Sequence, residues 1–219
     1  MNRLIYFLSI GFVAIAFGGC EPEVSFTEPQ PAENAAKEKF KSKFRGKFLC
    51  LEDSSVLHID KTAMVQKWHF EVESERDSLI NIKHNIGDYK YDADEEDLII
   101  KANQDSTKYV IDYKKTIFKI SPSSILKYEK GIYFLNTEKT GSTWDVKILH
   151  FDTDGSLLLK DLELSEEDLE KLKTITEVEV EKDVDGDITE YKLQPTPKEL
   201  KEILKSGLFE EGERFIRIK

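Results

Sequence analysis

A period-two alternation of apolar and polar residues recurs along the chain and restricts its fold more than any other feature. Residues 68–73 read WHFEVE and residues 144–149 read WDVKIL. Because successive side chains of a strand point to opposite faces, each stretch is typical of a strand with one buried and one solvated face. Shorter stretches of strand-like composition lie at residues 98–100, 109–111, 117–120, 132–135 and 175–181.

Short turn signals separate these stretches. They are the dipeptides Gly87-Asp88, Gly141-Ser142, Asp154-Gly155 and Asp185-Gly186. Many short strands joined by tight turns, without helices between them, indicate an antiparallel meander. The predicted fold class is therefore mainly β, a barrel- or sandwich-like antiparallel meander.

Two short helices are predicted near the C-terminus. The first has Ser165 as its N-cap, Asp168 as the acidic residue at the third helical position, and Leu164 packing on Leu169. The second begins at Thr196, with Pro197 in its first turn, Glu199 at the third position and Gly207 at its end. A closing strand is expected from Phe215 to Ile218.

Two stretches of similar composition suggest an internal repeat. Residues 45–49 read RGKFL and residues 130–134 read KGIYF, and each precedes a strand that contains a tryptophan. This pattern predicts two related halves at 45–121 and 122–219. The alternative is chance, since hairpins recur in every β protein.

The first twenty residues have the pattern of a secretion signal. Arg3 is the only charged residue before Cys20, the run from Leu4 to Phe17 is apolar except for Ser9, and glycines fill positions 18 and 19. This apolar run matches the core of a signal peptide and is short for a membrane-spanning helix, which needs about 20 apolar residues. Residues 1–19 are therefore predicted to be a cleaved signal peptide.

The run FGGC at residues 17–20 resembles the lipobox of bacterial lipoproteins. The resemblance covers residues 1–20 and implies that Cys20 becomes the first residue of the mature chain and carries fatty acyl chains such as palmitate. Phe17 departs from the family pattern, in which leucine is common at this place. The alternative is an ordinary signal peptide that is cut elsewhere, with Cys20 removed or left as a free thiol.

Residues 20–44 are predicted to be a tether between the lipid anchor and a β-rich domain at 45–219. Three prolines and four glutamates at positions 21–33 disfavour regular structure there. Six basic residues then follow between Lys37 and Lys47. They would either rest on anionic lipid headgroups or form the solvated first element of the domain.

The charge of the chain argues against broad binding of nucleic acid, which requires a basic surface. Its formal net charge is −11, and cleavage after residue 19 would remove one further positive charge, Arg3. Only two cysteines are present. With Cys20 acylated, Cys50 has no partner for a disulfide, and its apolar surroundings in FLCL predict a buried, inert thiol.

Candidate metal or catalytic sites are weak. The acidic stretches 152–155 and 183–187 have glycine at position 4, whereas a calcium loop of the EF-hand type has it at position 6, so hairpin turns explain them better. The pairs His69–Glu71 and His58–Asp60 offer two ligands each, fewer than a catalytic zinc usually takes. No nucleophile elbow, phosphate loop or dinucleotide motif is present. No enzyme activity, cofactor, catalytic residue or metal site is predicted, and the ligand-binding residues are unknown.

The chain as a whole resembles the uncharacterised β-rich envelope lipoproteins of Bacteroidota, a resemblance of overall pattern that implies no activity. We expect a protein anchored by Cys20 in the cell envelope, in the outer membrane, that contacts another envelope protein without catalysing a reaction. The alternative is a barrel-type carrier of a small apolar ligand, because small barrels can enclose one. The sequence alone does not assign the membrane face.

Overall fold

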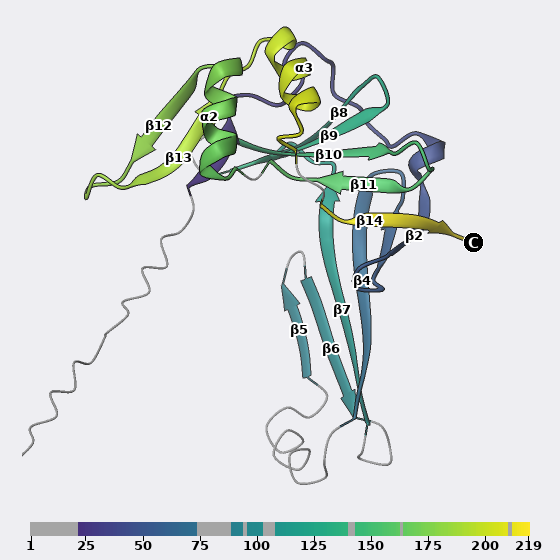
Figure 1. The fold of residues 1–219 in the computed structure, drawn as a ribbon. Helices are drawn as coiled ribbons and strands as arrows, with labels where there is room; N and C mark the ends of the chain where they lie inside the picture. Colours follow the sequence, from purple (N-terminus) through teal and green to yellow (C-terminus); the bar gives the residue numbers. More distant parts are fainter. Residues whose placement is uncertain are drawn as a thin grey trace, which may run out of the picture.

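The structure is a computed structural model. It describes residues 22–73, 89–93, 96–102, 108–139, 143–162, 164–209 and 212–219. Most of these residues belong to strands, and two α-helices lie in the C-terminal part (Figure 1). Cys20 and the signal segment lie outside the described residues.

The strands come in chain order with one 3-10 helix near the start and the two α-helices near the end. Their bounds are β1 Glu23–Phe26, η1 Ser42–Phe44, β2 Gly46–Cys50, β3 Val56–Ile59, β4 Ala63–Glu73, β5 Tyr89–Ala93, β6 Glu96–Ala102, β7 Lys108–Lys119, β8 Ser124–Glu129, β9 Ile132–Glu138, β10 Trp144–Phe151, β11 Leu157–Lys160, α2 Glu166–Ile175, β12 Val178–Lys182, β13 Ile188–Leu193, α3 Pro197–Ser206 and β14 Arg214–Ile218.

All the described strands belong to one sheet, with the order β12-β13-β1-β10-β11-β14-β2-β3-β4-β7-β6-β5 and with β8 and β9 branching from β10. Neighbouring strands run antiparallel except β1 and β13, which are parallel. The predicted mainly β, antiparallel architecture is confirmed. The sheet is not closed, because its path ends at β12 on one side and at β5 on the other.

The first core is formed by buried side chains of strands β2–β4, β7–β11 and β14 together with Phe40 and Phe44. Its centre is aromatic: the ring of Phe44 lies 4.8 Å from Tyr133 and 4.8 Å from Phe151, and Phe40 lies 5.1 Å from Tyr133. These edge-on and tilted contacts are the favourable arrangements of aromatic rings. Side chains of both predicted halves contribute, for example Leu57 and Leu126. The halves therefore share a core, and their relation as a repeat stays a prediction.

The second core lies between the opposite face of β9 and β10 and the helices α2 and α3, which Figure 1 shows on that side of the strands. Phe134 and Ile148 from the strands pack with Leu172 of α2 and with Leu200 and Ile203 of α3. Strand β9 is thus covered on both faces, which explains why four successive residues of it are buried.

Both predicted helix starts are confirmed. The Ser165 side chain accepts a hydrogen bond from the Asp168 N–H, and Thr196 forms a capping box with Glu199. Helix α3 ends at Gly207, whose positive φ of 81° is readily adopted by glycine. Helix α2 continues to Ile175, so the strand predicted from that residue begins instead at Val178. Strand β14 includes the predicted closing strand.

The described part of the predicted tether differs from an extended linker. Residues 23–26 form β1, a strand inside the sheet, and Phe26, Phe40 and Phe44 are buried in the two cores. The lysines between these phenylalanines are exposed. The segment therefore forms the first elements of the domain, because its apolar side chains and backbone groups find partners elsewhere in the fold.

Candidate interaction site

The candidate residues weighed in the sequence, where the structure describes them, are placed as follows. Cys50 is a buried free thiol, and desolvation raises its pKa, which disfavours the reactive thiolate. The carboxylate of Asp60 accepts the N–H groups of Thr62 at 2.6 Å and Ala63 at 2.7 Å, so it stabilises the turn between β3 and β4. His69 Nδ1 lies 2.7 Å from Asp112 Oδ1 on an exposed strand face.

The two calcium-like stretches are turns. Asp183 Oδ1 accepts the N–H groups of Asp185 and Asp187, both at 2.9 Å, and so closes the turn between β12 and β13. In the other turn, Asp152 and Asp154 form ion pairs with Arg214 at 3.2 and 3.0 Å. Within the described ranges, no three His, Cys, Asp or Glu side chains are grouped closely enough to hold a metal ion.

Two polar residues that sequence reasoning missed hold the N-terminal segment on the domain. Lys127 is buried, and its Nζ donates to the carbonyl oxygens of Pro29, Pro31 and Ala32 at 2.8, 2.9 and 3.1 Å. Desolvation lowers the pKa of this lysine. Asn136 on β9 is fully buried and binds the backbone of Gln30. Each is a polar residue within a largely apolar strand sequence. This pattern is the sequence signal that could have identified both residues.

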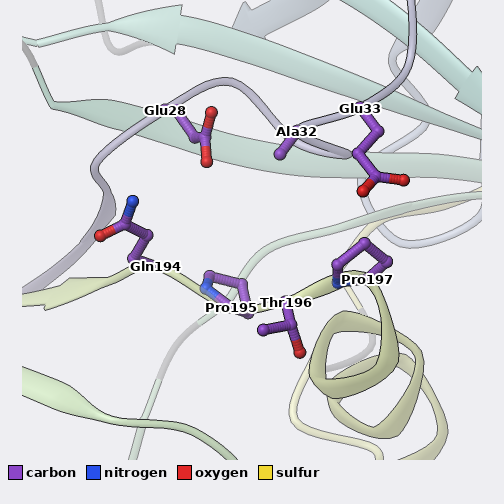
Figure 2. Close-up of a pocket in the computed structure, with 7 residues that line it drawn as sticks. All are labelled: Glu28, Ala32, Glu33, Gln194, Pro195, Thr196 and Pro197. Carbon is purple, nitrogen blue, oxygen red and sulfur yellow. The ribbon is translucent and has the colours of Figure 1, made fainter.

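The docked N-terminal segment forms one wall of a shallow cleft of about 510 Å³. Figure 2 shows Glu28 and Glu33 on this wall, facing Pro195, on the connection that leads into α3, and Pro197, the first residue of α3. The cleft is thus a consequence of the docking, with acidic groups on one side and proline rings on the other.

A second cleft of about 620 Å³ lies beside the start of β1. Asp145, Lys147 and Asp161 line it, and Lys147 Nζ lies 2.8 Å from Asp161 Oδ2. Desolvation raises the pKa of Asp145. Asp161 Oδ1 is buried without a hydrogen-bond partner in the described residues. The positive and negative charges that line this cleft largely balance one another. The cleft therefore favours neither an anionic nor a cationic ligand.

The β12–β13 hairpin is strongly acidic. Between residues 177 and 190 it carries seven acidic side chains and one basic side chain, Lys182. All the acidic residues of this stretch are exposed except Glu190, which is partly buried. Lys192 forms ion pairs with Glu181 and Glu190 and also interacts electrostatically with Glu179, which lies opposite it on β12. No ion pair involves Glu177 among the described residues.

The same hairpin exposes apolar side chains. Val180 and Ile188 are 41% and 36% exposed, and Val184 at the turn is fully exposed. Figure 1 shows the hairpin projecting from the body of the molecule, beyond the helices. Carboxylates and valines thus lie side by side on a projecting strand pair whose outer strand, β12, is an edge of the described sheet.

Comparisons with known proteins add no relative. No family model, curated protein or solved structure matches the chain. No helix of the described residues is long and apolar enough to cross a membrane.

Proposed function

We propose that this chain is a lipid-anchored protein of the cell envelope, held in the outer membrane through Cys20, and that it binds another envelope protein without catalysing a reaction. The single observation that supports this function best is the projecting, acidic β12–β13 hairpin with its exposed valines.

The position of the anchor supports a role at the membrane surface. Cys20 precedes Glu23, the first residue of β1, by three residues, so the chain between them spans at most about 10 Å. Strand β1 runs parallel to β13, with Glu23 beside Glu190. The chain therefore enters β1 from the end at which the hairpin turn lies, and a lipid on Cys20 would keep the hairpin close to the bilayer.

The carrier alternative receives no support from the first core. The rings of Phe40, Phe44 and Tyr133, all of them fully buried, pack together at the centre of this core. We therefore propose the binding function alone.

Site-specific photo-cross-linking in intact cells tests this function. A photoreactive phenylalanine analogue at Val184, which is fully exposed in the hairpin turn, is compared with the same analogue at the exposed Lys130 in the β8–β9 turn. We expect Val184 to trap one envelope protein, identified by mass spectrometry, that Lys130 does not trap. The same products from both positions, or none from either, would contradict the proposal.

A further inference from the structure

We propose that the partner of the hairpin presents an extended segment in which basic and apolar residues alternate, and that this segment adds to the outer edge of β12 as a further strand. This inference rests on the proposed function and specifies the chemistry of its partner.

The outer edge of β12 is available for pairing. β12 is the last strand at its end of the sheet and pairs with β13 alone among the described strands. An edge strand presents unpaired backbone N–H and C=O groups, and an extended peptide can satisfy them by forming one more antiparallel or parallel pair. Backbone pairing supplies affinity in this mode, and the side chains on the two faces supply specificity.

One face of β12 is acidic. Glu179 and Glu181 alternate with the valines of the strand, and Glu177 precedes them with the same spacing. Glu181 forms an ion pair with Lys192, and Glu179, which lies directly opposite Lys192, interacts with the same lysine. One cation therefore faces two carboxylates of β12, and no ion pair involves Glu177 in the described chain. Directly opposed charges of unlike sign stabilise a pair of strands. A neighbouring strand with lysine or arginine on this face would therefore be favoured.

The other face of β12 is apolar. Val178 packs against the second core, and Val180 continues the same face with 41% of its surface exposed. Apolar residues on this face of an added strand would cover Val180. Because strand residues alternate between faces, the two faces together select a segment with the period basic–apolar–basic–apolar.

A second copy of this chain is not the favoured occupant. Pairing of β12 with another β12 would bring glutamates together on one face, which is destabilising. The chain does contain an alternating basic and apolar stretch at residues 39–48, KFKSKFRGKF. Its residues Phe40, Phe44 and Phe48 are buried in the first core, so a second copy could supply it only by unfolding. The partner is therefore a different protein.

The test uses the purified acylated chain in micelles of a neutral detergent. The probe is a fluorescent peptide of sequence KVKVKVK, and its binding is measured by fluorescence anisotropy. We expect saturable binding with a Kd below about 1 mM. The E177K/E179K variant should bind the peptide at least about tenfold more weakly, which corresponds to 1.4 kcal/mol. The matched control is E71K/E138K, which makes the same change of charge at exposed glutamates on β4 and β9.

Two further peptides separate strand addition from simple charge attraction. The peptide KKKKVVV has the same composition without the alternation, and a version of KVKVKVK with every backbone N–H methylated keeps the charges but cannot donate to an edge. We expect both to bind much more weakly than KVKVKVK. Equal binding of either one, or no binding of KVKVKVK, would overturn the inference. A specific cross-link from Val184 would in that case still support the proposed function.

Discussion

The side chain of Asn136 binds both backbone polar groups of Gln30, a residue 106 positions earlier in the chain. Asn136 Oδ1 accepts the Gln30 N–H at 2.5 Å, and Asn136 Nδ2 donates to the Gln30 carbonyl oxygen at 3.0 Å. All of these atoms are buried in the fold. This amide acts as a substitute strand partner for an irregular segment, and it determines where the N-terminal segment lies on the domain.

Replacement of Asn136 by leucine should destabilise the protein strongly. The substitution keeps a similar volume but leaves the Gln30 N–H and carbonyl oxygen buried without these partners, and each such group costs about 1–3 kcal/mol. We expect the free energy of unfolding, measured by urea denaturation, to fall by about 2–4 kcal/mol. Asn34→Ala is the control, because its single bond to the Tyr128 carbonyl oxygen is 3.3 Å long and partly buried. Equal losses in the two variants would contradict this account.

Asp145 should make stability depend on pH with a defined sign. Burial raises the pKa of its carboxyl group, so the fold favours the protonated form. The protonated carboxyl group makes its full contribution to stability below the ordinary pKa of aspartate. This contribution is lost as the pH rises through the raised pKa of Asp145 in the folded protein. Asp145→Asn mimics the protonated form. It should therefore stabilise the protein at neutral pH and have little effect at about pH 3, below the unfolded pKa of aspartate.

Asp154 supplies a control of opposite sign. Hydrogen bonds from the Ser156 side chain and backbone lower the pKa of Asp154, so its stabilising contribution is present at neutral pH and is lost as the pH falls. Asp154→Asn should destabilise the protein at neutral pH, and the difference from the wild type should disappear in acid. Urea denaturation across the pH range measures both variants. If Asp145→Asn and Asp154→Asn showed the same pH dependence, the opposite directions of the two pKa shifts would be refuted.

Thr196 should contribute to stability as the N-cap of α3. Its side chain accepts the Glu199 N–H, and the Glu199 side chain accepts the Thr196 N–H at 2.8 Å. Thr196→Ala removes one partner of this capping box and should lower the free energy of unfolding by about 1 kcal/mol. Thr196→Ser keeps the hydroxyl group and should remain close to the wild type. A loss of similar size in both variants would point to packing rather than capping.

The lipid anchor is tested by the mass of the mature N-terminal peptide. We expect a peptide that begins at Cys20 and carries acyl chains, because residues 17–20 resemble a lipobox. Several acyl chains would be enough for stable membrane attachment. Cys20→Ala should shift the protein from the membrane fraction to the soluble fraction. Comparison of intact cells with and without surface protease would then assign the membrane face. An unmodified N-terminal peptide would refute the anchor.

Several elements follow from local sequence and were predicted in advance. The alternation from Trp68 to Glu73 places its side chains on two faces whatever the neighbours are, and the structure confirms this strand within β4. The capping of α3 by Thr196 and its end at Gly207 also depend on residues within one helix. Such features are determined by steric and hydrogen-bonding preferences that act over a few residues.

The long-range features depended on the tertiary structure. A proline-rich, charged segment was predicted to be a tether, but contacts of Lys127 and Asn136 with residues about a hundred positions away hold it on the domain. The sequence also predicted the turn at residues 183–187, whereas the position of β12 at the end of the sheet depends on the order of all the strands. The sequence by itself thus determined the alternating strands, the helix caps and the tight turns, but not strand β1 in the segment predicted to be a tether. The tertiary structure alone decided which of the described strands lie at the edges of the sheet, because strand order is set by pairing between distant segments rather than by local conformational preference.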